Sequence, residues 1–514
     1  MRTRRRCTTC VRAPRSRAFS RRRARADSRR TKRLSEELTR LSASRLAALI
    51  RRREVSPVEV VAAYLRRIEK LNPLLNAVVT LAPDAIERAR EVETRLTRGD
   101  DAGALAGVPV TVKDTFETAG LRTTFGSRLF AEHVPAHDAE AVARLRESGA
   151  VIIGKTNAAE LALDYTADNM VFGRTNNPFD FERTPGGSSG GCAAAVAACL
   201  TAASLGSDLV GSLRIPAHFC GVASFRPTAF GERASVGHLP PFEPPFSRGA
   251  SAGAIARTVE DVILLDSVLG EGVAASRVRE QLEKGGLEVV ERGLRVVRAA
   301  FYMFDGATQV TKETRASVEV AARALDAVGM NVSEETPPHV GRATELWLAL
   351  FSSATREFVG RLYAGREELA GRAARAVLER PLPATEDAQD EAWRTRDALR
   401  AELLRWLEET PVIVCPVGAV PALRHDAGRK IEVEGREMGA FRAFSYAQAF
   451  NVFDLPAVCV PVGVSPEGLP LGVQVAGHPE ALDKVFAAAL IVEEASGGWR
   501  GVAENLSKAA ESSV

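Results

Sequence analysis

The chain has 514 residues, 46% of them hydrophobic, so it can bury a large core and is predicted to be globular rather than disordered. No apolar run approaches the roughly 20 residues that span a bilayer, which predicts a soluble protein without a membrane span. The net charge of +3 is unevenly divided, because residues 1–33 hold 15 Lys or Arg and one acid, which leaves 53 bases and 64 acids, a net −11, in residues 34–514. This acidic body argues against a nucleic-acid partner for the folded part.

The basic segment 1–33 is predicted to be a disordered head, separate from a single domain over residues 34–500 and from a C-terminal tail, 501–514. Its composition is rich in Arg and Ser, and no apolar periodicity is present before Leu34. Three interpretations stay open for it: an RNA-binding arm, a transit-like targeting segment, or translated sequence upstream of the true start.

The cysteines number seven and lack the spacing of a disulfide framework, which favours reduced thiols in a cytoplasm. Cys7 and Cys10 form a single CxxC pair, but zinc needs four ligands and neither a second pair nor a His cluster follows nearby. We therefore expect no metal and no cofactor. Cys192 and Cys220 are predicted to be small buried hydrophobic residues.

The first folded segment, residues 34–71, has apolar residues at spacings of three and four, which predicts two amphipathic helices that pack on the core. The second helix has a clear start signal. Ser56 can cap the free backbone N–H groups, and Pro57 occupies the first helical position, where its missing donor costs nothing.

An alternation of strands and helices follows. Residues 107–113 and 150–154 are β-branched runs typical of buried central strands, and residues 138–148 have a helical pattern between them. The order predicts an α/β domain.

The rest of the chain is interpreted in the same way. We expect a close-packed helix rich in Ala over 192–200, a Pro-rich loop over 238–246, charge-rich helices over 268–410, strands over 412–417, 457–464 and 471–475, and a turn over 465–468.

Two serine-containing glycine runs carry the residue types that amide hydrolysis needs. The reaction requires a nucleophile, a base that later protonates the leaving amine, and donors for the developing oxyanion. Ser212 follows a short run in which a loop can turn several N–H groups toward one point. Ser188 lies in GGSSGG, a backbone free enough to adopt unusual dihedral angles.

Three motifs in order resemble the amidase signature family. They are GVPVTVKD with Lys113, GGSSGG with Ser188 and GSLRIP with Ser212, separated by 75 and 24 residues. Flanking sequence segments also resemble the family, at Gly154-Lys-Thr-Asn157, Asn177-Pro178, Phe219-Cys-Gly-Val222, Asn451 and Leu455-Pro456. The likeness covers residues 35–495 and implies one large α/β domain with a central mixed sheet flanked by helices.

The resemblance also implies a mechanism. Neutral Lys113 draws a proton through Ser188 from Ser212, which attacks the carbonyl to form an acyl-enzyme, and the bond between Gly187 and Ser188 is cis. The oxyanion hole is expected from the backbone N–H groups of residues 209–211, which are Leu209, Val210 and Gly211.

Other polar residues near these motifs have plainer interpretations. No His completes a convincing Ser/His/Asp set, and His218, six residues after Ser212, is interpreted as a structural or pocket residue. Asp208 and Arg214 are expected to orient the nucleophile loop rather than to act chemically.

The nucleophile loop departs from the family pattern at one position. The family has Gly-Gly-Ser where this chain has Val210-Gly211-Ser212. The Val N–H can donate, but its branched side chain restricts the backbone and crowds the pocket. Ser224 stands where the family commonly has Gly, and residues 231–248 also diverge.

Three functions are carried forward. The first is a stand-alone amidase acting on a small-molecule amide, aryl or acyl, with a homodimer left open. The second is the glutaminase subunit of a tRNA-dependent amidotransferase, which needs a partner and groups for the glutamine carboxylate and amine, although residues 439–450 hold no acid. The third is a catalytically weakened amidase-like binding protein, for which Val210 is the only argument.

Overall fold

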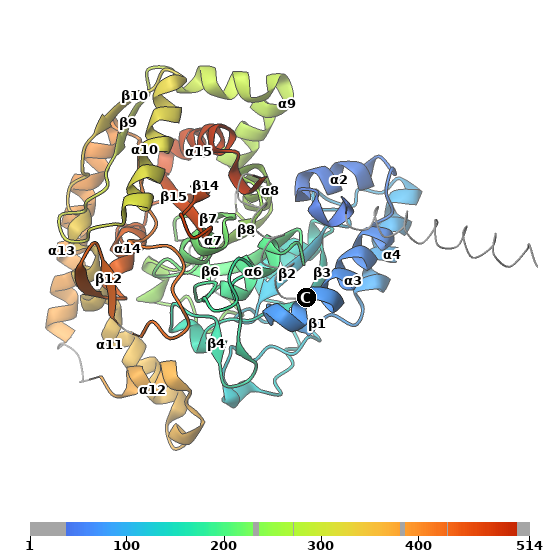
Figure 1. Ribbon diagram of the computed structural model, residues 1–514. Coiled ribbons are helices and arrows are strands. Elements are labelled where there is room, and N and C mark those ends of the chain that lie inside the picture. Colours follow the sequence, from blue (N-terminus) through green and yellow to red (C-terminus); the bar gives the residue numbers. More distant parts are fainter. Residues whose placement is uncertain (1–36, 230–235, 271, 381–385, 429, 501–514) are drawn as a thin grey trace, which may run out of the picture.

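A computed structural model describes residues 37–229, 236–270, 272–380, 386–428 and 430–500 (Figure 1). The expectations for residues 1–33, for residues 501–514 and for Cys7 and Cys10 lie outside these residues. Within the described chain no helix is both long enough and apolar enough to cross a membrane.

The centre of the molecule is one mixed sheet of 11 strands in the order β1-β3-β2-β6-β8-β7-β14-β15-β11-β9-β10. Strand β2 is parallel to both β3 and β6, β9 is parallel to β10 and β11, and the other neighbouring pairs are antiparallel. The strands are β1 (Val78–Leu81), β2 (Pro109–Lys113), β3 (Val151–Thr156), β6 (Ala203–Asp208), β7 (Ala223–Arg226), β8 (Ser251–Ala256), β9 (Arg298–Phe301), β10 (Asn331–Glu334), β11 (Val412–Pro416), β14 (Ala457–Val464) and β15 (Pro470–Gly477).

The sheet is buried on both faces, because successive side chains of one strand enter two different apolar clusters. In β11, Val412 and Val414 belong to one cluster, and Ile413 and Cys415 belong to the other. Side chains alternate across a strand, so the two clusters lie on opposite faces. The prediction of a single large α/β domain with a central mixed sheet flanked by helices is confirmed.

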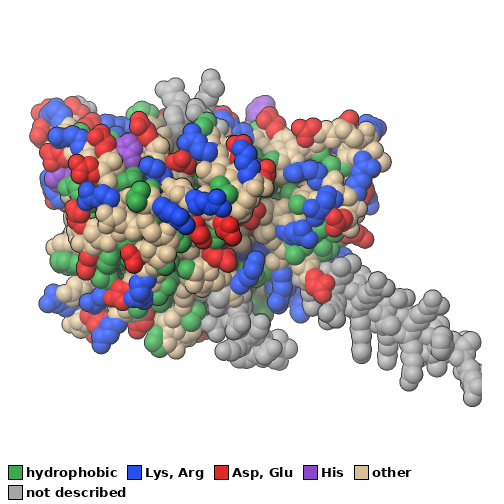
Figure 2. Space-filling view, turned by 90° about the horizontal axis from the view of Figure 1, so that it is seen from above, with side chains coloured by type: hydrophobic (Ala, Val, Ile, Leu, Met, Phe, Trp, Pro, Cys, Tyr) green, Lys and Arg blue, Asp and Glu red, His purple; other side chains and the backbone are tan. Residues whose placement is uncertain are grey.

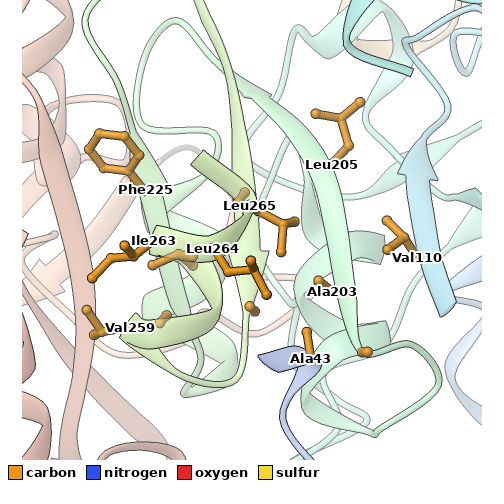
Figure 3. Close-up of a cluster of buried hydrophobic side chains, with 14 of the residues drawn as sticks. Ala43, Val110, Ala203, Leu205, Phe225, Val259, Ile263, Leu264 and Leu265 are labelled. Atoms are coloured by element: carbon orange, nitrogen blue, oxygen red, sulfur yellow. The ribbon is translucent and has the colours of Figure 1, made fainter. Parts of the chain in front are cut away.

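Helices cover each face. Helices α8, α10 and α15 share the first cluster with the sheet, and α6, α7, α11 and α14 share the second. Figure 3 shows side chains of α8 beside residues of β2, β6 and β7 in the first cluster. The helices are α2 (Ala43–Arg51), α3 (Pro57–Leu75), α4 (Ala85–Arg98), α5 (Glu140–Glu147), α6 (Gly190–Ala197), α7 (Arg214–Cys220), α8 (Val259–Leu269), α9 (Val273–Leu294), α10 (Lys312–Ala327), α11 (Ala343–Tyr363), α12 (Arg372–Leu378), α13 (Glu386–Glu409), α14 (Ser445–Val452) and α15 (Leu482–Ser496).

Most of the elements expected from local pattern are present. The two N-terminal helices are α2 and α3, and Ser56 caps α3 in a capping box with Glu59 while Pro57 begins the helix. The predicted strands over 107–113, 150–154 and 457–464 correspond to β2, β3 and β14.

The expectation of charge-rich helices over 268–410 was incomplete, because the short strands β9 and β10 lie inside this region. Each has four residues, and β10 is mostly exposed at the end of the sheet. A strand this short at a sheet edge has too little apolar alternation to be recognised from sequence.

The surface carries charges of both signs. On the face seen in Figure 2, acidic and basic side chains are interspersed among small apolar areas. The acidic balance of the body is therefore spread over this face rather than gathered in one part of it.

The close approach of α6 to the sheet gives a first testable prediction. A Cβ at Gly191 would lie 2.4 Å from Asn157 O and 2.5 Å from Asn157 N, both backbone atoms that cannot move aside. We expect Gly191→Ala to lower the free energy of unfolding by about 2 kcal/mol, measured by urea denaturation. Gly293→Ala is the matched control, since a Cβ there meets nothing within 4 Å, and it should be neutral or slightly stabilising; equal losses in both variants would contradict the packing argument.

Candidate active site

Three polar residues of the site lie at the carboxyl ends of β2 and β6, which are neighbouring strands inside the sheet. Figure 1 shows these strands in the middle of the molecule. Lys113 is the last residue of β2, and Ser207 and Asp208 end the neighbouring strand β6. These strands are parallel, so their carboxyl ends meet at the same edge. In open α/β sheets this is the usual place for a ligand site.

Lys113 lies at the centre of a buried hydrogen-bond cluster. Its Nζ donates to Ser188 Oγ at 2.7 Å and to Ser207 Oγ at 2.9 Å. Burial lowers the pKa of Lys113 from 10.5 to about 8. At pH 7 roughly one Lys113 in ten is then neutral, compared with about one in 3000 for a solvated lysine. A neutral amine has a lone pair, so this side chain can accept a proton.

Ser188 is fixed by the turn that leads into α6. The peptide bond between Gly187 and Ser188 is cis, as the family resemblance predicted. A Cβ at Gly187 would lie 2.5 Å from Thr166 N and 2.6 Å from Asp164 O, so only glycine fits before this serine. Ser188 is buried, and its carbonyl accepts a hydrogen bond from Ala159 N.

Ser212 lies two residues before the start of α7, beside the Ser188 segment. Its carbonyl accepts from Ser189 N at 3.3 Å, and its residue is 4% exposed. Within the described residues no hydrogen bond joins the hydroxyls of Ser212 and Ser188, whereas Lys113 and Ser188 are joined directly. Catalytic hydrogen bonds are often long in an empty site and shorten when substrate binds.

The loop that carries Ser212 is held by a buried ion pair. Asp208 accepts from Gly211 N at 2.7 Å and Leu213 N at 3.0 Å, and Arg214 Nε lies 3.0 Å from Asp208 Oδ2. Burial alone would raise the pKa of Asp208, but the Arg214 guanidinium and these hydrogen bonds hold it below its ordinary value. Asn451 Nδ2 also donates to Asp208, at 3.0 Å. The expectation that Asp208 and Arg214 orient this loop agrees with these contacts.

Two aromatic side chains fix the backbone at the segment expected to form the oxyanion hole. Trp347 Nε1 donates to Leu209 O, and the Tyr165 hydroxyl donates to Val210 O, each at 3.1 Å. In a trans peptide the N–H points opposite to the C=O, so Trp347 sets the direction of the Val210 N–H. The Gly211 N–H is already engaged by Asp208, whereas those of Leu209 and Val210 make no hydrogen bond among the described residues.

These two side chains belong to a group of aromatic rings beside the nucleophile loop. We call this group the aromatic wall; it consists of Tyr165, Trp347, Phe441 and Phe444. The ring of Tyr165 lies 4.9 Å from that of Phe444, and the ring of Trp347 lies 5.2 Å from that of Phe441. The wall therefore borders the loop with apolar surface that carries two directed donors.

Glycine is required at position 211, between the proposed donors and Ser212. Its φ is +102°, and a Cβ there would lie 2.6 Å from Ile215 Cδ1 and 2.8 Å from Ala447 Cβ. The departure from the family at Val210 thus leaves the constrained glycine next to Ser212 in place.

His218 and the two cysteines have structural surroundings. His218 Nδ1 accepts from Gly472 N at 2.8 Å and its Nε2 lies 3.0 Å from Val420 O, so the ring links two other segments. Burial lowers the pKa of His218 to about 4, which keeps it neutral. Cys192 and Cys220 are fully buried, as expected.

Sequence reasoning missed four residues that the fold brings to this site: Ser207, Tyr165, Trp347 and His238, whose Nε2 lies 3.0 Å from Ser207 Oγ. Ser207 stood inside the GSDLVGS run and could have been suspected. The other three come from a loop, from α11 and from a segment judged divergent, and no local motif marks them. Three-dimensional proximity is the only signal that identifies them.

No metal site is evident in the part of the chain that the structure describes, since three or more His, Cys, Asp or Glu side chains nowhere gather there in a suitable arrangement. The expectation of a chain without metal or cofactor stays a prediction.

Comparison with known proteins identifies the class of enzyme. The family model described as Amidase matches residues 59–481, most of the chain. The protein is a hydrolase that acts on carbon–nitrogen bonds of amides other than peptide bonds. It belongs to the amidase signature family, as the three motifs predicted.

The chain is similar to relatives along nearly its whole length. The A-type subunit of the glutamyl-tRNA(Gln) amidotransferase of Thermus thermophilus is 35% identical over 485 residues, 88% of this chain and 97% of the relative. Its counterpart in Bdellovibrio bacteriovorus is 31% identical over 493 residues, 90% of this chain and 98% of the relative. The solved structure of 6-aminohexanoate cyclic dimer hydrolase has a TM-score of 0.76 and 27% identity, with 89% of this chain and 97% of that chain covered.

The buried ion pair gives a second prediction. Asp208→Asn leaves the Arg214 charge buried without its counter-ion, so the free energy of unfolding should fall by about 3 kcal/mol in urea denaturation. The double variant Asp208→Asn/Arg214→Gln should lose clearly less than the sum of the single variants, because each single change strands the other partner. Additive losses would show that the two side chains do not act as a pair.

Proposed function

We propose that the protein hydrolyses carboxylic amides through Ser212 as nucleophile, with Ser188 and Lys113 as its proton relay. The observation that carries this proposal is the buried Lys113, with Nζ 2.7 Å from Ser188 Oγ, beside the loop that bears Ser212. A lysine buried without a nearby unpaired carboxylate loses stabilisation of its charged form, which is what a base requires.

The reaction proceeds in two halves. Ser212 gives its proton through Ser188 to the Lys113 lone pair while its Oγ bonds to the amide carbon. The C–N bond then breaks, and the relay returns the proton to the departing ammonia or amine, leaving an ester on Ser212. Water attacks this ester by the same proton path in reverse, which releases the acid and restores Ser212.

The developing oxyanion is proposed to lie against the N–H groups of the segment 209–211. Leu209 and Val210 are the donors favoured by their unengaged N–H groups, and the contact from Trp347 to Leu209 O supports the orientation of the Val210 N–H. Gly211 contributes only if its N–H leaves Asp208.

The substrate is proposed to be a small amide with an aryl or acyl group. The aromatic wall supports this, since its rings adjoin the nucleophile loop at Leu209 and Val210. The side-chain amide of Gln448, beside the wall, already has protein partners. Its Nε2 donates to the Tyr165 hydroxyl and to Phe441 O, and its Oε1 accepts from the Thr344 hydroxyl. Assays on a panel of primary amides, anilides and acyl amides identify the preferred class.

A second candidate is the glutaminase subunit of a tRNA-dependent amidotransferase. The relative from Thermus thermophilus, a subunit of such an enzyme, is 35% identical over 88% of this chain. Against it, free glutamine needs partners for a carboxylate and an ammonium, and the residues 439–450 that hold part of the aromatic wall include no acid. Release of ammonia from glutamine, together with copurification of a partner protein, would favour this candidate over the stand-alone enzyme.

Domain extent and location are proposed with the function. We propose one amidase domain over residues 34–500 in a cytoplasmic protein. The described cysteines, Cys192, Cys199, Cys220, Cys415 and Cys459, are buried free thiols, which supports a reducing compartment. Sedimentation of the purified chain decides whether it forms the homodimer left open above.

Labelling with a fluorophosphonate probe tests the nucleophile directly. The intact protein should form a covalent adduct, Ser212→Ala should form none, and Lys113→Ala should label at least about 100-fold more slowly because the base is lost. Ser204→Ala, a buried serine on the same strand as Ser207 that bonds Thr111, is the control and should label at the native rate. An intact protein that does not label contradicts this mechanism and favours the weakened binding protein.

The pH dependence of turnover tests the base. Only neutral Lys113 can accept the proton, so kcat/KM should rise with pH and level off above its pKa of about 8. A profile measured from pH 6 to pH 9.5 should therefore show a tenfold rise per pH unit on its acidic side. A flat profile over this range would remove Lys113 as the titrating base.

A further inference from the structure

The second hydrogen-bond partner of Lys113 is itself bound to a histidine. Ser207 Oγ lies 2.9 Å from Lys113 Nζ and 3.0 Å from His238 Nε2. His238 Nδ1 in turn lies 2.6 Å from Pro240 O. The four groups form one continuous chain from the lysine to a backbone carbonyl.

The Pro240 carbonyl fixes the direction of donation in this series of hydrogen bonds. Pro240 O can only accept, so the proton of His238 is on Nδ1. In a neutral imidazole Nε2 then has a lone pair and accepts from the Ser207 hydroxyl. Because the single Ser207 proton points at His238, its oxygen can only accept from Lys113.

The neutral state of the ring follows from its surroundings. His238 is buried between Phe116, whose ring centroid is 4.6 Å away, and Phe242, at 4.2 Å. The charged groups that act on it are Lys113 and Lys155, and burial together with these cations lowers the pKa of His238 to about 3. The ring is therefore neutral over the range from pH 6 to pH 9.5 in which turnover is to be measured.

The direction of these hydrogen bonds decides which hydroxyl the Lys113 lone pair can accept from. A neutral amine has two N–H groups and one lone pair. If Ser207 could turn its proton toward Lys113, it would occupy that lone pair and compete with Ser188. With the Ser207 proton held by His238, Lys113 donates an N–H to Ser207 and its lone pair stays available to Ser188.

We propose that His238 is a positioning residue, which holds the Ser207 proton away from Lys113 and so keeps the Lys113 lone pair for Ser188. This inference rests on the proposed function, since it assigns His238 a task only if Lys113 is the base. It also gives the segment that diverges from the family pattern a role at the site.

The test measures the rate of Ser212 labelling by the fluorophosphonate probe in the full chain. His238→Phe keeps an aromatic ring between Phe116 and Phe242 but removes the acceptor. Freed from His238, the Ser207 proton competes for Lys113, so the labelling rate should fall roughly 10- to 100-fold, and a modest loss of stability should accompany it because Pro240 O loses its donor. An unchanged labelling rate would overturn the proposal.

A second substitution separates this role from a merely structural one. Ser207→Ala removes the competing proton, so it should cost less than His238→Phe, and the double variant Ser207→Ala/His238→Phe should label faster than His238→Phe alone. A structural role predicts the opposite, because losing two contacts of one network adds to the damage. A double variant slower than His238→Phe contradicts the proposal.

A matched pair keeps the test decisive if the Phe variant does not fold. His238→Gln places an amide oxygen that can accept from Ser207 and should label within about threefold of the native rate, whereas His238→Met, of similar size, should be slow. Equal rates for this pair overturn the proposal. A native labelling rate in Lys113→Ala, with labelling lost in Ser212→Ala, would instead show that Lys113 is not the base of the proposed function, on which this inference rests.

Discussion

The burial of the Lys113 amine is the constraint on which the rest of the site depends. The fold removes this amine from water and gives it two hydroxyl partners but, among the described residues, no carboxylate partner, so its charged form is poorly compensated and its pKa falls toward the working pH. Strand β2 lies between β3 and β6 and is parallel to both. Its carboxyl end, which carries Lys113, therefore lies inside the molecule next to α6, away from water. An exposed lysine at the same position in the chain would stay protonated and would not serve as a base.

The Asp208–Arg214 ion pair helps to keep the pKa of Lys113 low. Asp208 is the one carboxylate in the described chain whose charge raises the pKa of Lys113 noticeably, and Arg214, buried against it, offsets that negative charge. Asp208 also accepts hydrogen bonds from the backbone of Gly211 and Leu213. The ion pair therefore shapes the Ser212 loop and, because Arg214 neutralises Asp208, leaves Lys113 without a full counter-charge. The aromatic wall completes the loop from the other side by holding the carbonyls of Leu209 and Val210.

Local sequence pattern and motifs predicted much of this arrangement, and what they could not predict has a physical reason. Helices α2 and α3, the strands that carry Lys113 and its neighbours and the α/β class follow from periodicity and capping, whereas the placement of Lys113 beside Ser188 follows from the family resemblance. Strands β9 and β10 were missed because each has only four residues and neither alternates between buried and exposed side chains: two adjacent residues of β9 are buried, and β10 is mostly exposed at the sheet edge. Trp347, Tyr165 and His238 were missed because each reaches the site from a distant element, and a hydrogen bond between such elements has no signature in either segment. Val210 was recognised as a departure, but the indole that fixes its N–H could be found only in three dimensions.

The ionisation of Lys113 is the most direct test of this account. Lysine labelled at its ε-carbon can be followed by carbon NMR over a pH titration of the whole protein, with Lys113→Met and Lys155→Met to assign the two buried side chains. Both are buried without full compensation, and burial lowers the pKa of each to about 8. The account predicts a resonance that titrates near pH 8 and is absent from Lys113→Met. A Lys113 resonance that titrates above pH 10, like a solvated lysine, would contradict its role as the base.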